Sequence, residues 1–141
     1  MNALIGMKKR ARTILDRFKG PEGQRNTIEG LRAQQIVHHA DGLAKRLSAV
    51  AVLESYPLGR AFINQNDHTT DIFFILVGSV SIRINGREVN NRKAGQHVGE
   101  MAAIDVSALL SASVVATSET VVARITEPDF SKIAAEYPDI W

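Results

Sequence analysis

The sequence predicts an α+β, mainly β fold: a sandwich or barrel-like roll of about eight strands, with helices on both sides of it in the chain. Three observations predict this fold. After Val50 the chain contains short runs that are rich in Val, Ile and Phe. Turn residues separate these runs at intervals of about eight to ten residues. Apolar residues at helical spacing come before and after the runs.

Length and composition predict one globular domain. The chain has 141 residues, of which 45% are hydrophobic and 23% are charged, as in folded soluble proteins. It contains no cysteine, which excludes disulfides and thiolate metal sites. Apolar runs such as "IFFILV" are too short to cross a membrane, and the first residues lack the pattern of a signal peptide. A cytoplasmic protein without a membrane partner is the simplest interpretation.

The first fifty residues are predicted to be helical. Apolar residues recur there at spacings of three and four, and they predict three helices, over residues 3–18, 27–38 and 41–49. Gly20, Pro21 and Gly23 predict a break between the first two helices. Asn26 or Thr27 would then cap the second helix.

The positive charge is concentrated in the same segment. Residues 1–50 contain ten Lys/Arg and four Asp/Glu, a net charge of +6, whereas residues 51–141 contain seven and eleven, a net charge of −4. A basic segment of this kind could contact nucleic acid, an acidic partner, lipid headgroups or a second copy of the chain, or it could be a solvated face. We find no helix-turn-helix spacing and expect no direct contact with nucleic acid.

Eight runs after Val50 have the composition of strands: 51–56, 60–65, 71–78, 79–84, 87–92, 95–100, 111–118 and 119–126. Asn85-Gly86 stands between two alternating runs, which is the strongest short-range signal for a hairpin. A last helix is predicted after these strands, with Thr126 as its cap and Pro128 in its first turn.

No arrangement of residues in the sequence indicates catalysis. The four histidines, His38, His39, His68 and His97, are not spaced as metal ligands beside a carboxylate cluster. The chain has neither a Gly-x-Ser-x-Gly elbow nor a phosphate loop that ends in Gly-Lys-Ser/Thr. We therefore expect a binding protein that is not an enzyme and that has no catalytic residues, metal or cofactor.

The stretch "VGEMAAID" has residue types that suit a small anion with a sugar attached. Gly99 allows the backbone to come close to a ligand. The N–H groups of Met101 and Ala102 would begin a short helix, and helix N-termini hold phosphate. Glu100 would repel a phosphate but can accept a hydrogen bond from a hydroxyl such as a ribose 2′-OH. Alternatively, Glu100 only caps the turn.

From about Leu53 to Trp141 the chain resembles a cyclic nucleotide-binding domain. The resemblance is carried by "YPLGRAFINQND", "DIFFILVGSVSIRINGRE", "AGQHVGEMAAID", "SASVVATSETVVARI" and "EPDFSKIAAEYPDIW". It implies a β-roll of eight strands over residues 51–141, preceded by the helical segment 1–50. It also implies that Gly99, Glu100, Met101 and Ala102 form the phosphate-binding cassette, with Ser111 beside the phosphate or the base.

One position departs from the family pattern. Just before "SAS" the family has an arginine that can clamp the phosphate, and this chain has Leu110. Arg92, Lys93 or His97 could approach from neighbouring strands. Three interpretations stay open: the pocket uses a different cation, it binds its ligand weakly, or it has kept the fold and lost nucleotide binding.

The sequence "NGREVNNRKAGQHVGEMAAID", which follows a basic helical segment, is similar to sequences of the Pycsar antiphage effectors. In these proteins a domain that binds cyclic pyrimidine nucleotides such as cUMP or cCMP precedes a TIR domain that degrades NAD. The resemblance implies an effector module after Trp141, following a lid helix that this sequence does not include. The alternatives are a degenerate fold that serves as an oligomerisation or interaction module, and the sensor domain of a transcription regulator.

Overall fold

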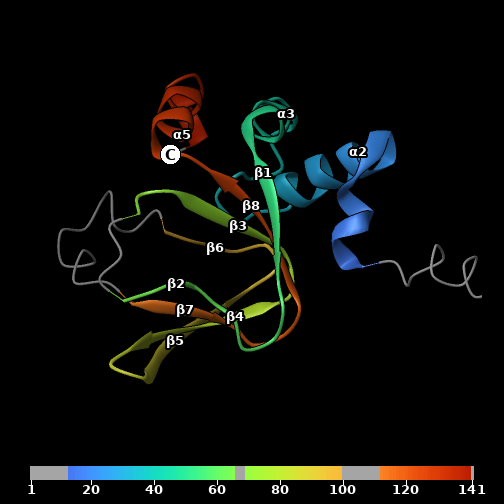
Figure 1. Ribbon diagram of the computed structural model, residues 1–141. Helices are drawn as coiled ribbons and strands as arrows, with labels where there is room; N and C mark the ends of the chain where they lie inside the picture. The colour runs from blue at the N-terminus through green and yellow to red at the C-terminus, as the bar shows by residue number, and fades with distance from the viewer. Residues whose placement is uncertain (1–12, 66–68, 100–111, 141) are drawn as a thin grey trace, which may run out of the picture.

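The computed structural model describes residues 13–65, 69–99 and 112–140. Two antiparallel four-stranded sheets face each other and form a roll (Figure 1). In the first sheet the strand order is β1-β8-β3-β6: Val52–Tyr56, Thr120–Ile125, Ile72–Val77 and His97–Val98. In the second sheet it is β2-β7-β4-β5: Ala61–Ile63, Ser113–Ala116, Ser79–Ile84 and Arg87–Lys93.

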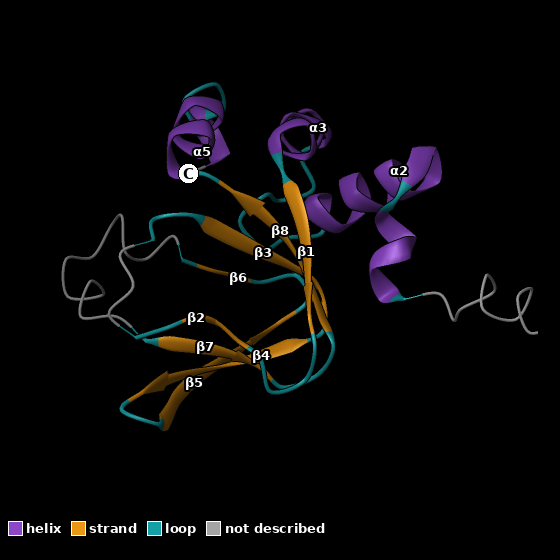
Figure 2. Ribbon diagram, viewed as in Figure 1, coloured by secondary structure: helices purple, strands orange, loops and turns teal. Residues whose placement is uncertain are grey.

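The helices gather on the side of the β1-β8-β3-β6 sheet, as Figure 2 shows in purple. They are α2 (Gly20–Arg32), α3 (Asp41–Val50) and α5 (Glu127–Ala134), with 3₁₀ turns η1 (Ile14–Phe18) and η3 (Pro138–Ile140). Among the described residues, no helix is long and apolar enough to cross a lipid bilayer.

Two clusters of buried side chains result from this layering. The first joins the helices to the outer face of the β1-β8-β3-β6 sheet: Leu31, Val37, Leu43, Ala44, Leu47, Ile72, Phe74, Ala123, Ile125, Phe130 and Ile133. The second, which we call the interior cluster, lies between the two sheets: Ile63, Phe73, Ile75, Val80, Val98, Val114 and Val122. The predicted fold class, a β-roll of eight strands with flanking helices, is confirmed.

The predicted break between the first two helices is present, but it is confined to Lys19, which is extended between η1 and α2. α2 begins at Gly20 and continues through the stretch that contains Pro21 and Gly23. Proline is favoured in the first turn of a helix, where its missing N–H costs nothing. Gly23 is required because a side chain there would collide with the backbone of Phe18. The glycines and the proline therefore mark a helix start that packs against η1.

The limits of the first two predicted helices also differ from the structure. Of the predicted helix 3–18, residues 1–12 lie outside the described residues, and the rest forms only the short η1. Thr27 lies inside α2 and donates its hydroxyl to the Gly23 carbonyl oxygen, so neither Thr27 nor its neighbour Asn26 is a cap.

α2 ends at Arg32 instead of continuing to the predicted end at residue 38. The main chain leaves the helix because it bonds to the roll: the Gln35 N–H donates to the Gly95 carbonyl oxygen at 2.9 Å. His38 and His39 then adopt positive φ angles in a turn.

The other local predictions hold. The third helix is α3, and all eight predicted strands are present. Asn85 and Gly86 have φ angles of 51° and 79° in the β4–β5 hairpin, as a two-residue turn of this type requires. Thr126 caps α5, because its side-chain oxygen accepts a hydrogen bond from the Asp129 N–H at 3.4 Å.

Candidate functional site

Gly99 follows the last residue of β6 and has a φ angle of +101°. Backbone of this kind strongly favours glycine. A side chain at this position would also collide with the carbonyl oxygen of Asp71 and crowd the ring of Phe73. Gly99 is thus a place where two backbone segments meet closely, at the end of the roll where β6 stops.

The rest of the predicted cassette lies outside the described residues. This applies to Glu100, Met101 and Ala102, and equally to Leu110 and Ser111. The structure does describe the two ends that this segment connects. β6 ends in one sheet and β7 begins in the facing sheet, at the same end of the roll (Figure 1).

Arg92 lies on the face of its strand that lines the interior of the roll. Directly paired residues of antiparallel strands share a face, and Arg92 pairs with Val80 of the interior cluster. Lys93 is the next residue and points to the opposite face, because side chains alternate along a strand. His97 pairs with Phe74 and packs against its ring on the helix side of the sheet, with 5.8 Å between ring centroids.

Asn90 joins Arg92 on the same interior face, because it pairs with Ile82, which packs against the interior cluster. Arg92 is half-buried, whereas its neighbours on β5 are exposed. One of its guanidinium nitrogens donates to the Asn91 carbonyl oxygen at 2.8 Å, and Arg92 has no carboxylate partner among the described residues. The interior face of β5 therefore carries a cation and an amide next to apolar side chains.

A second charged group on the interior side was not predicted from the sequence. The Arg124 guanidinium on β8 lies 2.8 Å from the Asp71 carboxylate and 3.5 Å from the Glu54 carboxylate. It also lies over the ring of Phe73, 5.1 Å from the centroid. Tyr56 donates its hydroxyl to Glu54. One cation thus holds two carboxylates from different parts of the chain.

The electrostatics of this group follow from these contacts. The hydrogen bond to Asp71 raises the pKa of Arg124, so its charge is permanent. Burial, followed by the hydrogen bond to Glu54, raises the pKa of the Tyr56 hydroxyl, which therefore stays protonated. The sequence signal for this group is an arginine inside the apolar run "TVVARI", on the same strand face as Val122.

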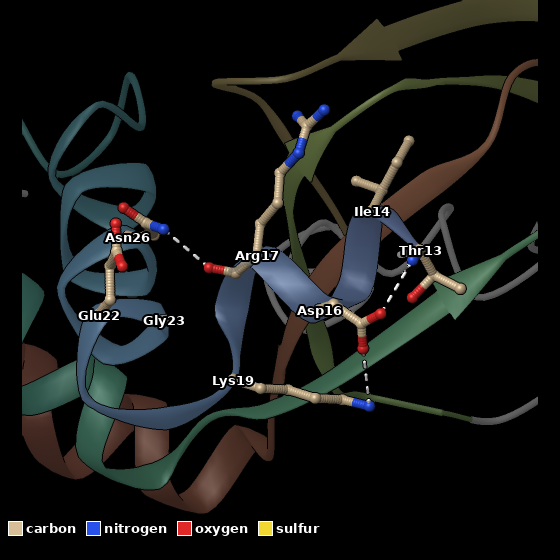
Figure 3. A pocket seen from close by; sticks show the side chains of 8 residues that line it. All are labelled: Thr13, Ile14, Asp16, Arg17, Lys19, Glu22, Gly23 and Asn26. Atoms are coloured by element: carbon tan, nitrogen blue, oxygen red, sulfur yellow. Dashed lines mark hydrogen bonds and ion pairs between the residues drawn. The ribbon is translucent and has the colours of Figure 1, made fainter. Parts of the chain in front are cut away.

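A separate hollow lies between η1 and the start of α2 (Figure 3). The Asp16 carboxylate there accepts a hydrogen bond from the Thr13 N–H and pairs with Lys19 at 3.2 Å, and both contacts lower its pKa. Asn26 donates to the Arg17 carbonyl oxygen. Since these polar groups satisfy one another, we interpret the hollow as the packing of η1 on α2.

No group of three or more metal-ligating side chains occurs in the part of the chain that the structure describes. The described part of the roll has a glycine with positive φ where β6 ends and a cation on the interior face of β5. The sequence pattern of the cyclic nucleotide-binding domain family matches residues 53–137. The chain belongs to the cyclic nucleotide-binding domain family.

Three curated relatives are similar to the chain over 128 residues, or 91% of its length. They are the Pycsar effector proteins XpPycTIR of Xanthomonas perforans, PaPycTIR of Pseudomonas aeruginosa and BcPycTIR of Burkholderia cepacia, with identities of 43%, 37% and 38%. The chain spans 42% of the length of each relative.

Solved structures share the fold at lower identity. The regulatory domain of Toxoplasma gondii PKA with cAMP superimposes with a TM-score of 0.69 at 18% identity, over 83% of this chain and 47% of that one. A mutant regulatory subunit of a cAMP-independent protein kinase A from Trypanosoma brucei, bound to cAMP, gives 0.70 at 24% identity, over 83% and 45%. These likenesses show the fold.

Proposed function

We propose that this domain binds a cyclic mononucleotide and thereby controls an effector module in the same polypeptide. The observation that carries the proposal is the family match over residues 53–137, together with similarity to Pycsar effectors over 91% of the chain. The domain itself would be a sensor without catalytic residues. By analogy with the relatives, the effector would be a TIR domain that degrades NAD in antiphage defence.

The ligand would sit where β6 ends. Gly99 with the N–H groups of Met101 and Ala102 would meet the cyclic phosphate, Glu100 would accept the ribose 2′-OH, and Ser111 would line the site. The family match over residues 53–137, which includes this segment, supports this proposal.

Arg92 would be the cation that replaces the family arginine, whose place is taken by Leu110. Two observations support this assignment. Arg92 shares the interior face of the roll with Val80, whereas Lys93 points to the opposite face and His97 packs toward the helices. Its guanidinium is also not neutralised by a carboxylate among the described residues, so its charge is available for a phosphate or a polar base.

Titration calorimetry with cyclic UMP, CMP, AMP and GMP tests the proposal. We expect a cyclic pyrimidine nucleotide to bind most tightly, as the resemblance to the Pycsar effectors implies. Glu100→Ala should then cost about 1.5–3 kcal/mol, or roughly ten- to a hundredfold in affinity. Absence of binding by all four nucleotides at millimolar concentration would contradict the sensor function. An unchanged affinity of Glu100→Ala would mean that Glu100 only caps the turn.

The cation is tested with two adjacent residues of the same charge. Arg92→Ala should weaken binding about tenfold or more, whereas the matched control Lys93→Ala, on the opposite strand face, should leave the affinity within about twofold. Leu110→Arg in the Arg92→Ala background should restore affinity, because it returns a guanidinium to the family position. If Leu110→Arg alone tightens binding and Arg92→Ala has no effect, the site is a weakened one that lacks its cation.

A second candidate function, an interaction module, is favoured by the β4–β5 hairpin. Ile84 and Val89 are 43% and 53% exposed there, and β5 is an edge strand of its sheet. Exposed edge strands can pair with another chain. Light scattering distinguishes the two functions. An interaction module would self-associate without nucleotide, and Val89→Lys would abolish this self-association. Neither the parent nor the variant would then bind a nucleotide.

A further inference from the structure

Arg124 ties three strands of the first sheet together at one end of the roll. It stands on β8, and its guanidinium reaches the carboxylates of Glu54 on β1 and of Asp71, which directly precedes β3. It also covers the ring of Phe73, its directly paired neighbour on β3. The side chains of Arg124, Asp71 and Glu54 are 39%, 21% and 29% exposed, so the group is partly shielded from water.

Gly99 rests on the same two residues that Arg124 holds. A Cβ at Gly99 would lie 2.2 Å from the Asp71 carbonyl oxygen and 3.3 Å from Cδ1 of Phe73. β6, which leads into Gly99, is an edge strand whose register contains only the pairs Phe73–Val98 and Phe74–His97. The residues before it are also fixed to β3, because the Ile75 N–H donates to the Gln96 carbonyl oxygen at 2.9 Å and the Gly95 N–H donates to the Ile75 carbonyl oxygen at 3.0 Å. Beyond Val98 the described neighbours of Gly99 are Asp71 and Phe73, and the position of the Gly99 turn depends on where these two residues lie.

At position 124 a guanidinium is more favourable than a neutral side chain. Without it, Glu54 and Asp71 would be two partly buried carboxylates that no longer share a cation, and repulsion would favour their separation. Asp71 precedes the first residue of β3, where the strand pairing gives way to a loop. Among the described residues the Asp71 N–H donates to the Thr69 hydroxyl, a local hydrogen bond that at 3.2 Å is long.

We propose that Arg124 is a positioning residue, which holds Asp71 and Phe73 as the support of the Gly99 turn and thereby sets the affinity for the ligand. The consequence for affinity rests on the proposed function. Arg124 acts through Asp71 and does not bind the phosphate itself, because two carboxylates already occupy its guanidinium. Arg92 differs in this respect, because no carboxylate among the described residues pairs with it.

Three single variants of this group and one double variant test the proposal by calorimetry with cyclic UMP, the nucleotide expected to bind. Arg124→Gln should weaken binding about tenfold, the loss expected from one misplaced charge-assisted hydrogen bond. Asp71→Asn should weaken it as well, and combining both should cost no more than the larger single effect. Arg124→Lys should restore part of the affinity. The matched control is Arg83→Gln on the second sheet, where the Arg83 side chain donates to the Ser81 hydroxyl and pairs with no carboxylate among the described residues.

The sign of the Asp71→Asn effect separates positioning from direct binding. If the Arg124 guanidinium met the phosphate itself, Asp71→Asn would free it from a competing anion and tighten binding. Tighter binding would thus overturn the proposal. An affinity loss in Arg83→Gln as large as in Arg124→Gln would overturn it too, because it would reflect general destabilisation.

Amide chemical shifts in the nucleotide-free protein separate failure of this inference from failure of the proposed function. Arg124→Gln should shift the Val98 and Gly99 amide signals and leave those of β5 unchanged. If the parent binds no nucleotide but these shifts occur, the sensor function fails while the positioning role stands. If the Gly99 signal does not move, Arg124 does not position the turn, whatever the parent binds.

Discussion

At the scale of single residues, glycine with positive φ is placed at both ends of β3. Gly99 packs on Asp71 where β3 begins, and Gly78 packs on Glu119 and Thr120 where β3 ends. Their φ angles, +101° and +98°, are nearly the same. Only Gly99 lies at the proposed ligand site, so the two positions separate the demands of folding from those of binding.

Gly99→Ala and Gly78→Ala should each destabilise the protein by at least about 1–2 kcal/mol, because the new side chain opposes the backbone conformation and collides with a carbonyl oxygen. Chemical denaturation measures this loss. Calorimetry should show that Gly99→Ala also lowers nucleotide affinity at least tenfold, whereas Gly78→Ala binds like the parent. Equal affinity losses in the two variants would count against a special role of Gly99.

At the scale of elements, one buried amide joins the segment after α2 to the sheet. The Gln34 side chain is 1% exposed, and its Nε2 donates to the Ile75 carbonyl oxygen on β3 at 2.8 Å and to the Gly30 carbonyl oxygen at 3.3 Å. Its Oε1 has no hydrogen-bond partner among the described residues. The residue is therefore suited to donating and poorly suited to carrying negative charge.

Gln34→Glu should lower the free energy of unfolding by about 2–4 kcal/mol at pH 7, because burial without a cation disfavours the charged carboxylate. The folded-state pKa of the new carboxyl would lie above its unfolded value. The loss should therefore be small below pH 4, where the protonated group can still donate to Ile75, and should grow as the pH rises. Gln35→Glu, at an exposed position, is the matched control. A pH-independent loss would contradict this explanation.

A bidentate ion pair connects α3 to the residues just after α5, two of the three helices on the side of the first sheet. The Arg46 guanidinium on α3 bonds to both Glu136 carboxylate oxygens, at 3.0 and 2.6 Å, just after α5. The hydrogen bond from Arg46 lowers the pKa of Glu136, so the pair's contribution is present above the unfolded-state pKa and is lost as the pH falls. Arg46→Gln should slightly lower the melting temperature at pH 7 but not at pH 3. A difference at pH 3 as large as at pH 7 would show that packing, not charge, is responsible.

At the scale of the whole molecule, the helical segment and the roll share a hydrophobic core. Leu31, Leu43 and Leu47 are fully buried against the outer face of β3 and β8. The predicted division of the chain into a helical segment, residues 1–50, and a β-roll, residues 51–141, stays a prediction. The shared core implies that the two parts depend on each other for stability.

We expect the fragment 51–141 not to unfold cooperatively on its own, because the apolar face of Ile72, Phe74 and Ile125 would be exposed to water. Circular dichroism during thermal unfolding, compared with the full chain, measures this. A sharp transition in the fragment, close to that of the full chain, would show that the roll is stable without the helices. Addition of a separate 1–50 peptide should partly restore the transition if the contact is specific.

The sequence by itself determined the strand runs, the Asn85-Gly86 hairpin and the capped last helix. These features depend on alternation, turn residues and capping, which act between neighbours in the chain. It also singled out Gly99, for close approach of the backbone to a ligand, whereas the neighbour that the structure shows there is the Asp71 backbone. The family resemblance assigned the cassette around it, whose remaining residues stay a prediction.

Only the tertiary structure decided the remaining points, because they depend on contacts between distant residues. Packing of Gly23 against Phe18 places the glycines and the proline at the start of α2 and confines the expected break to Lys19. Strand register decided that Arg92 lies on the interior face of the roll. The Arg124 guanidinium donates a hydrogen bond to the carboxylate of Asp71, 53 residues away in the chain, because β3 pairs with β8. No local pattern encodes such a pair, since its energy exists only once the sheet has formed.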